Sequence, residues 1–252
     1  MMSTRSNNRV ALTLAFLILT LSSVIASNNI ANELEQKVVS LFSQMDKHPV
    51  AISRDNNNIQ VRTSQQGDQM ITFSEAKHTD IHPDKFKGFL ENFQSEFPKV
   101  NTMVESVKPL TTINKKIGNR VGVKSILKFP FPLTDRIMIH WKYLNLHRGG
   151  PKQHEHMLYL SEQSNDELIN SESHYSEAEK KKYVLGKTFL CAYWIRPIYC
   201  EQEEDIIGSK ISYLFSGDTG GNVPMKIQNM MGPKAALESI QNLIEHVKSK
   251  SK

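Results

Sequence analysis

The chain has 252 residues, of which 39% are hydrophobic and 23% charged; this composition supports a packed core and argues against intrinsic disorder. Its formal net charge at pH 7 is +5, and most basic residues are scattered along the sequence, so we expect no nucleic-acid partner. Two cysteines are too few for a disulfide-rich scaffold.

Residues 1–26 have the pattern of a secretory signal peptide. Two arginines precede an almost wholly apolar run over residues 10–21, and the segment ends at the small residue Ala26. We expect cleavage after Ala26 and a mature domain, residues 27–252, in the secretory pathway, either secreted or held in an endomembrane lumen. An uncleaved signal anchor is the alternative, although the apolar run is short for a membrane span.

Apolar spacing predicts the first elements of the mature chain. Residues 31–45 carry apolar side chains at helical spacing. Strands separated by polar turns are expected at residues 49–52, 59–63 and 70–77. A short helix opens at His82 and is expected to end at Pro98, because proline cannot continue a helix.

Strands dominate the middle of the chain. We expect them at residues 103–113, 120–128, 136–146, 156–161, 187–201 and 210–216. The polar residues 164–182 are expected to form a loop. Cys191 and Cys200 share one of these strands, which holds their Cα atoms about 30 Å apart. We therefore expect two free thiols, unless a tight turn at residues 196–197 joins them.

The chain ends in a strand, a turn and a long amphipathic helix. Asp218, Gly220 and Gly221 supply turn chemistry after the last strand. Pro224 stands where a helix would begin, and residues 237–247 show helical apolar spacing. With no internal repeat, this order of elements predicts one α+β domain with a mostly antiparallel sheet.

Two motifs resemble START domains, the StAR-related lipid-transfer family. The first is the turn Asp218-x-x-Gly221-x-x-Pro224 between the last strand and the final helix. The second matches the family's Pro-x-Ser/Thr-x-Arg segment at Pro132, Thr134 and Arg136. An acidic residue usually follows this arginine in the family, and Ile137 stands there instead. By element order the resemblance covers residues 33–252.

The resemblance implies a helix-grip fold, in which a curved antiparallel sheet and a long C-terminal helix enclose a hydrophobic cavity. It implies binding, and intermembrane transfer, of one lipid such as a phospholipid or a sterol, by a monomer that needs no cofactor. An enzyme acting on a hydrophobic small molecule in the same hollow fold is the alternative, because fold does not fix function.

Nine residues are candidates for contact with such a lipid. An amphipathic ligand needs apolar walls and a few polar donors. The arginines would donate forked hydrogen bonds to a charged head group, the aromatic rings would form walls, and the methionines would adapt to the ligand. The candidates are Arg136, Trp141, Tyr143, Tyr159, Trp194, Arg196, Tyr213, Met230 and Met231. Ordinary core packing for the aromatics, and a surface position for the arginines, are the alternatives.

Other motifs give a membrane contact and exclude some chemistry. Phe129 and Phe131 flank a proline in a predicted loop, where they would dip transiently into a bilayer surface or fold back as a lid. His154 and His156 lack a third ligand at metal-binding spacing, so no metal is expected. No hydrolase, metalloprotease or phosphate-binding motif occurs, and we expect no enzyme activity.

Overall fold

The computed structural model describes residues 29–54, 58–66, 69–110, 120–150, 153–161, 174–200, 205–221 and 223–250. The predicted signal segment, residues 1–26, lies outside these ranges, so its cleavage and the secretory location stay predictions. In the part of the chain that is described, no helix is both long and apolar enough to cross a bilayer.

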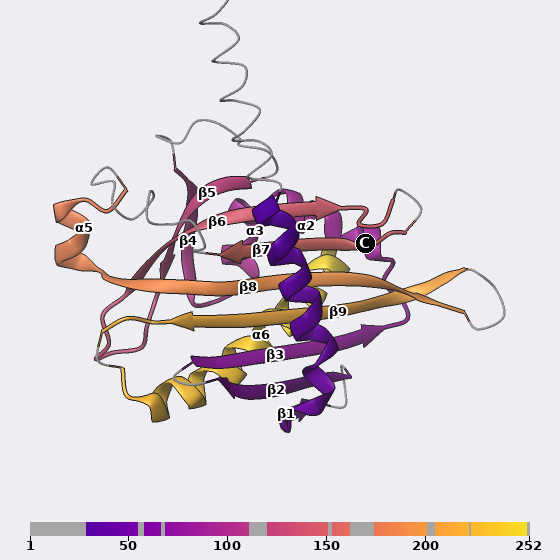
Figure 1. Ribbon diagram of the computed structural model, residues 1–252, viewed down its shortest axis with the longest axis horizontal. Helices are drawn as coiled ribbons and strands as arrows, with labels where there is room; N and C mark the ends of the chain where they lie inside the picture. The colour runs from indigo at the N-terminus through magenta and orange to yellow at the C-terminus, as the bar shows by residue number, and fades with distance from the viewer. Residues whose placement is uncertain are drawn as a thin grey trace, which may run out of the picture.

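The centre of the molecule is one nine-stranded sheet in the order β1-β2-β3-β9-β8-β7-β6-β5-β4 (Figure 1). Neighbouring strands are antiparallel, and the start of β8 also pairs in parallel with the start of β6. The strands are β1 (Val50–Arg54), β2 (Ile59–Gln66), β3 (Gln69–His78), β4 (Val104–Pro109), β5 (Arg120–Leu127), β6 (Arg136–Leu146), β7 (His156–Ser161), β8 (Val184–Tyr199) and β9 (Ile206–Asp218).

Helices cover both faces of this sheet. A helix over residues 29–43, here called the N-terminal helix, crosses one face, and α6 lies behind the other (Figure 1). The remaining helical elements are η1 (Met45–Lys47), η3 (Pro83–Phe86), α2 (Lys87–Glu91), α3 (Phe93–Val100), α5 (Glu177–Lys182) and α6 (Met225–Lys250). This is the predicted α+β helix-grip architecture.

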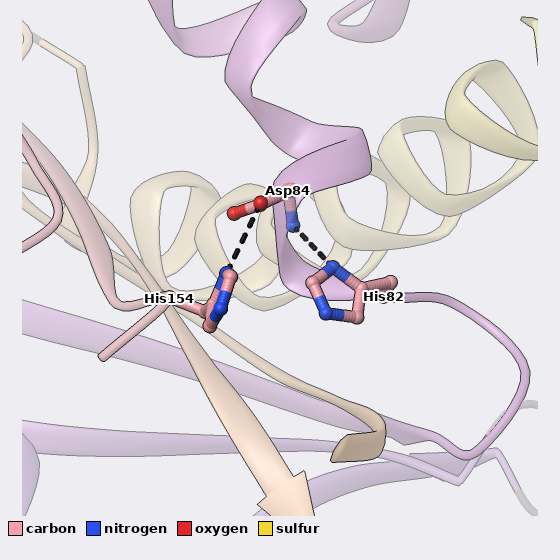
Figure 2. A group of neighbouring side chains, drawn as sticks. All are labelled: His82, Asp84 and His154. Carbon is pink, nitrogen blue, oxygen red and sulfur yellow. Dashed lines mark hydrogen bonds and ion pairs between the residues drawn. The ribbon is translucent and has the colours of Figure 1, made fainter. Parts of the chain in front are cut away.

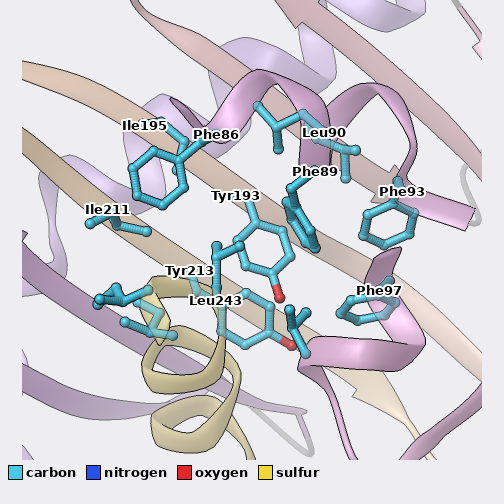
Figure 3. Close-up of a cluster of buried hydrophobic side chains, with 14 of the residues drawn as sticks. Phe86, Phe89, Leu90, Phe93, Phe97, Tyr193, Ile195, Ile211, Tyr213 and Leu243 are labelled. Atoms are coloured by element: carbon cyan, nitrogen blue, oxygen red, sulfur yellow. The ribbon is translucent and has the colours of Figure 1, made fainter. Parts of the chain in front are cut away.

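Each face of the sheet has its own hydrophobic core, because successive side chains of a strand point to opposite faces. On β8, Tyr193 and Ile195 belong to the core under α2, α3 and α6, which we call the inner face (Figure 3). Trp194 belongs to the core under the N-terminal helix, which we call the outer face. Cover on both faces explains why the first eight residues of β6 are all buried.

Two predictions about helices were wrong. The helix expected to end at Pro98 continues as α3 to Val100; the proline removes one hydrogen bond, but Phe93 and Phe97 are buried in the inner core and hold the turn in place. The expected loop at residues 164–182 contains α5. Its capping box, Ser176 with Glu179, was present in the sequence as a helix start signal.

The cysteine prediction is confirmed: Cys191 and Cys200 are both free thiols. Cys191 is buried within β8, and Cys200 follows the last residue of that strand. One long strand therefore separates them, as the sequence indicated.

Candidate functional site

A cavity of about 100 Å³ lies between the inner face of the sheet and the start of α6. Met70 of β3, Leu127 of β5 and Phe215 of β9 form its sheet wall. Met231 and Gly232 close it from α6. The second half of α6 instead packs directly on the sheet, through an apolar stripe that runs from Leu237 to Val247. The cavity is thus confined to the first turns of the helix.

A second chamber of about 50 Å³ adjoins the first. The two share five lining residues: Asn101, Leu127, Met138, Tyr213 and Phe215. The wall of the second chamber adds Ser125, His140, Thr188 and Cys191. A mainly apolar outer cavity therefore leads to a smaller chamber that carries polar groups.

His140 is the centre of these polar groups. Its Nε2 lies 3.3 Å from the Ser125 hydroxyl, and its Nδ1 lies 3.3 Å from the Thr188 hydroxyl. The residue is only 2% exposed, and burial lowers the pKa of His140 to about 3. The ring is therefore neutral at pH 7, with one nitrogen donating and the other accepting.

The neighbouring ionisable groups are neutral as well. Burial raises the pKa of the Cys191 thiol to about 12, and burial also raises the pKa of the Tyr213 hydroxyl. Among the described residues that line the two chambers, none carries a formal charge. The site thus offers uncharged donors and acceptors within apolar walls.

A β-bulge explains how two of these groups share one chamber. Thr188 and Cys191 are three residues apart, so strict alternation would place them on opposite faces of the sheet. The register of β8 against β9 shifts between Thr188 and Leu190, and the extra residue turns both side chains inward. Strict alternation in the sequence did not predict that Thr188 and Cys191 lie in the same chamber. It also did not identify His140 as a site residue, although His140 points to the same face of β6 as Met138.

Three predicted ligand or membrane residues do lie at the cavity. Tyr213, Met231 and Phe129 are part of its lining, and their contact with a ligand stays a prediction. Met230 is 70% exposed and is absent from the cavity lining. Phe131 is 97% exposed, and its contact with a membrane stays a prediction.

Four predicted aromatic wall residues lie on the outer face instead, where they pack beneath the N-terminal helix. They are Trp141, Tyr143, Tyr159 and Trp194. The rings of Tyr143 and Tyr159 stack at 4.9 Å, and the Tyr159 hydroxyl donates to the Ala31 carbonyl at 2.9 Å. Their strand parity sets this position. The open alternative of core packing is therefore the correct one for these residues.

Arg196 shares that outer face. Its guanidinium lies 3.9 Å from the centre of the Trp194 ring, donates to the Ser212 hydroxyl at 2.8 Å and lies 3.6 Å from a Glu75 carboxylate oxygen. These contacts hold its guanidinium on the face opposite the cavity. The prediction that Arg196 binds a ligand head group therefore does not fit the structure.

Arg136 joins the two motifs that resembled START domains. It donates to the carbonyls of Thr219 at 2.8 Å and Gly220 at 3.3 Å, and also to that of Thr134. Its guanidinium stacks on Phe129 at 4.6 Å. The arginine of one motif thus holds the turn of the other, and it is absent from the cavity lining. Its predicted role as a head-group ligand is replaced by a structural one.

Solved structures share this fold. Human StAR-related lipid transfer protein 5 superposes with a TM-score of 0.66 at 10% identity, over 89% of this chain and 97% of that one. Human STARD10 gives a TM-score of 0.58 at 15% identity, covering 86% and 82% of the two chains. A STAR-related lipid transfer protein from Xanthomonas axonopodis gives 0.55 at 13% identity, covering 80% and 98%.

No protein-family model and no curated protein sequence matches the chain. At 10–15% identity the structural matches establish the fold. The chain therefore has the helix-grip fold of StAR-related lipid transfer domains.

Proposed function

We propose that this chain binds one lipid without a formally charged group, such as a sterol or another neutral lipid with a hydroxyl or carbonyl, and transfers it between membranes. The observation that carries this proposal is the uncharged lining of the two chambers, with neutral His140 at the polar end. Solved proteins of this fold are named for lipid transfer, which supports the general class of ligand.

Electrostatics favours a neutral ligand over a phospholipid or a fatty acid. Burying a phosphate or carboxylate without a cationic partner costs several kcal/mol. Arg136 and Arg196, the two arginines once expected to pair with such a group, are held by other partners outside the lining. A ligand hydroxyl, in contrast, would hydrogen-bond to the Ser125 and Thr188 hydroxyls, which keep acceptor capacity beside their contacts with His140, and each buried CH₂ contributes about 0.8 kcal/mol.

Binding would require the start of α6 to move. The present cavity of about 100 Å³ is smaller than the pockets of roughly 300–1,000 Å³ that hold small molecules. Apolar packing anchors the helix from Leu237 to Val247, whereas its first turns only border the cavity. We infer that these first turns swing away from Met70 when a lipid enters.

The rim of the cavity supports a transient membrane contact. Phe129 and Met231 line the cavity, and their near neighbours Phe131 and Met230 project into solvent. Exposed apolar side chains next to residues that line a cavity suit the interface of a bilayer. The sequence predicted that Phe129 and Phe131 contact the membrane. We propose instead that Phe131 and Met230 make this contact, because Phe129 lines the cavity.

The protonation states of the chamber favour binding over catalysis. A general base works best with a pKa near the working pH, and the pKa of His140 is about 3. A nucleophilic cysteine acts as the thiolate, and the pKa of Cys191 is about 12. We therefore propose a carrier rather than an enzyme.

The test is direct binding with three fluorescent probes: a sterol, a diacylglycerol and a phosphatidylcholine. The proposal predicts saturable binding of the sterol or the diacylglycerol, and at least tenfold weaker binding of the phosphatidylcholine. Native mass spectrometry of the purified chain checks for a co-purifying neutral lipid. Preferential binding of the phospholipid would overturn the neutral-ligand class, and binding of none of the probes would overturn lipid binding itself.

A further inference from the structure

We propose that His82, Asp84 and His154 form a binding site for a zinc-class divalent cation, separate from the lipid cavity. Their candidate ligand atoms all lie within 4.8 Å of one another. His82 caps the start of η3, Asp84 lies within that element, and His154 comes from the connection between β6 and β7 (Figure 2). None of the three belongs to the lining of either chamber.

The three side chains face a common point. His154 Nδ1 lies 3.0 Å from Asp84 Oδ2, and the rings of His82 and His154 meet edge to face at 5.0 Å. Figure 2 shows the two rings on either side of Asp84, with the carboxylate turned toward His154 and the backbone nitrogen toward His82. Ligand atoms around a tetrahedral zinc ion, at about 2.0–2.2 Å from the metal, lie roughly 3.3 Å apart. Small rotations of these half-buried side chains would produce that spacing.

A second layer of contacts fixes Asp84. His156 Nε2 lies 2.9 Å from Asp84 Oδ1. The His147 backbone N–H donates to His156 Nδ1 at 3.2 Å, so the neutral ring of His156 carries its proton on Nε2 and donates to the carboxylate. A histidine that orients a ligating carboxylate in this way is a common outer-shell arrangement. Oδ2 thus remains directed toward His82 and His154.

A further histidine stands next to the cluster. The Nδ1 atom of His147 is buried and has no hydrogen-bond partner. Its ring centre lies 5.2 Å from that of His156 and 6.4 Å from that of His154. Buried polar atoms are normally satisfied, so an unsatisfied imidazole nitrogen beside a His–Asp–His group is a separate indication that a ligand belongs here.

Two contacts in the structure oppose metal binding and would lower the affinity of the site. His82 Nδ1 accepts a hydrogen bond from the Asp84 backbone N–H at 3.3 Å, so coordination by Nε2 requires this long bond to be released. Lys87 Nζ lies 3.2 Å from Asp84 Oδ1, on the oxygen that faces His156. The lysine charge weakens the attraction for a cation but does not occupy Oδ2.

The donor set selects the class of metal. Imidazole nitrogens with one carboxylate suit zinc and its neighbours among the transition metals, whereas calcium and magnesium prefer oxygen ligands alone. The sequence argument missed this group because it considered only His154 and His156; the other ligands come from about 70 residues earlier in the chain. A bound ion would join η3 to the β6–β7 connection.

Isothermal titration of the purified full chain with ZnCl₂ tests the site. We expect one Zn²⁺ per chain, at least tenfold weaker binding in His154→Gln and in His82→Gln, and unchanged binding in the matched control His246→Gln. His246 pairs with Glu96 on α3, away from the cluster. The same variants are also followed by thermal unfolding, in which Zn²⁺ should raise the Tm of the wild type and the control only.

Two results would overturn the site: no binding of Zn²⁺ by the wild type, or equal affinity in wild type and both cluster variants. Circular dichroism identifies a variant that fails to fold, and the remaining variant then decides. Co²⁺ gives a further readout, since a visible spectrum typical of nitrogen and oxygen ligands should appear in the wild type and disappear in His154→Gln. Lipid binding should be unchanged in both variants.

Discussion

The two faces of the sheet are built from the same strands but have different contents. The outer face, under the N-terminal helix, is filled by large aromatic side chains such as Trp141 and Tyr143. The inner face, under the start of α6, leaves a cavity whose wall carries His140 and Thr188. Alternation along each strand thus gives the outer face a solid core and the inner face a core that contains the cavity. A substitution on the outer face should therefore change stability without changing lipid affinity.

Trp141→Ala is the strongest test of the outer face. Trp141 is almost fully buried, and the Arg120 guanidinium stacks on it at 4.3 Å. Its removal should lower the free energy of unfolding by about 3–5 kcal/mol, measured by urea denaturation. Lipid affinity of the folded protein should hold. Trp141→Phe, which keeps a ring, should lose clearly less stability; a large loss of affinity in either variant would contradict the division between the faces.

Arg136→Leu tests the junction between the two motifs. The arginine donates to the carbonyls of Thr219 and Gly220, and hydrogen bonds from a charged donor contribute about 1.5–3 kcal/mol each. We expect the free energy of unfolding to fall by about 2–4 kcal/mol while lipid affinity is retained. Arg136→Lys keeps the charge without the forked geometry and should recover only part of the loss. Weaker lipid binding at unchanged stability would restore the head-group role.

These positions show what the sequence could and could not predict. Apolar spacing located the strands and both long helices, because burial on one or two faces sets a period that is visible in a single chain. The parity that groups Trp141 with Ile139 was also visible. The sequence did not show which of the two parities faces the cavity, because both faces of the sheet are apolar and each is covered by a helix.

Local irregularities and distant contacts set the remaining limits. The bulge that brings Thr188 and Cys191 into one chamber leaves no clear mark in the sequence. Two partners of Arg136, Thr219 and Gly220, lie more than 80 residues away, and the resemblance to START domains named the arginine without naming these contacts. The His–Asp–His group likewise depends on a tertiary approach of two segments.

Ala235→Trp tests the inner face. Ala235 lines the cavity of about 100 Å³, and an indole there should fill most of that space. Binding of the fluorescent sterol or diacylglycerol should weaken by about two powers of ten. The matched control Lys234→Trp places the same side chain one residue earlier, at an exposed position, and should bind as the wild type does. Equal binding by both variants would show that the ligand lies elsewhere.

His140 gives the inner face a pH dependence. The pKa of His140 is about 3 in the folded chain and about 6.5 when unfolded. Between about pH 6.5 and pH 3 the unfolded chain binds more protons at this residue than the folded chain does. The free energy of unfolding therefore has its full contribution from neutral His140 above about pH 6.5, and this contribution decreases as the pH falls. At pH 5 the loss should be about 2 kcal/mol. Urea denaturation at pH 7 and pH 5 measures it.

The control for this pH effect is His140→Gln, which keeps a donor and an acceptor but does not titrate. The other ionisable groups change equally in both proteins, so the wild type should lose about 2 kcal/mol more than the variant between pH 7 and pH 5. An equal loss in the two proteins would show that His140 accepts a proton without unfolding, and hence that water reaches the chamber.

Phe131→Ser is expected to have the smallest effect, and it acts at the rim between cavity and solvent. The side chain is almost fully exposed, so the free energy of unfolding should change by less than about 0.5 kcal/mol. If Phe131 inserts into the bilayer interface, binding to neutral phosphatidylcholine vesicles should weaken by about tenfold, since partial burial of a phenyl ring contributes on the order of 1.5 kcal/mol.

Met230→Ser, next to the lining residue Met231, should act in the same direction. Ile207→Ser replaces an exposed apolar residue of β9 outside the cavity lining and serves as the control. Vesicle co-sedimentation measures all three, and equal losses in all three would mean that general surface hydrophobicity, rather than the rim of the inner face, sets the membrane contact.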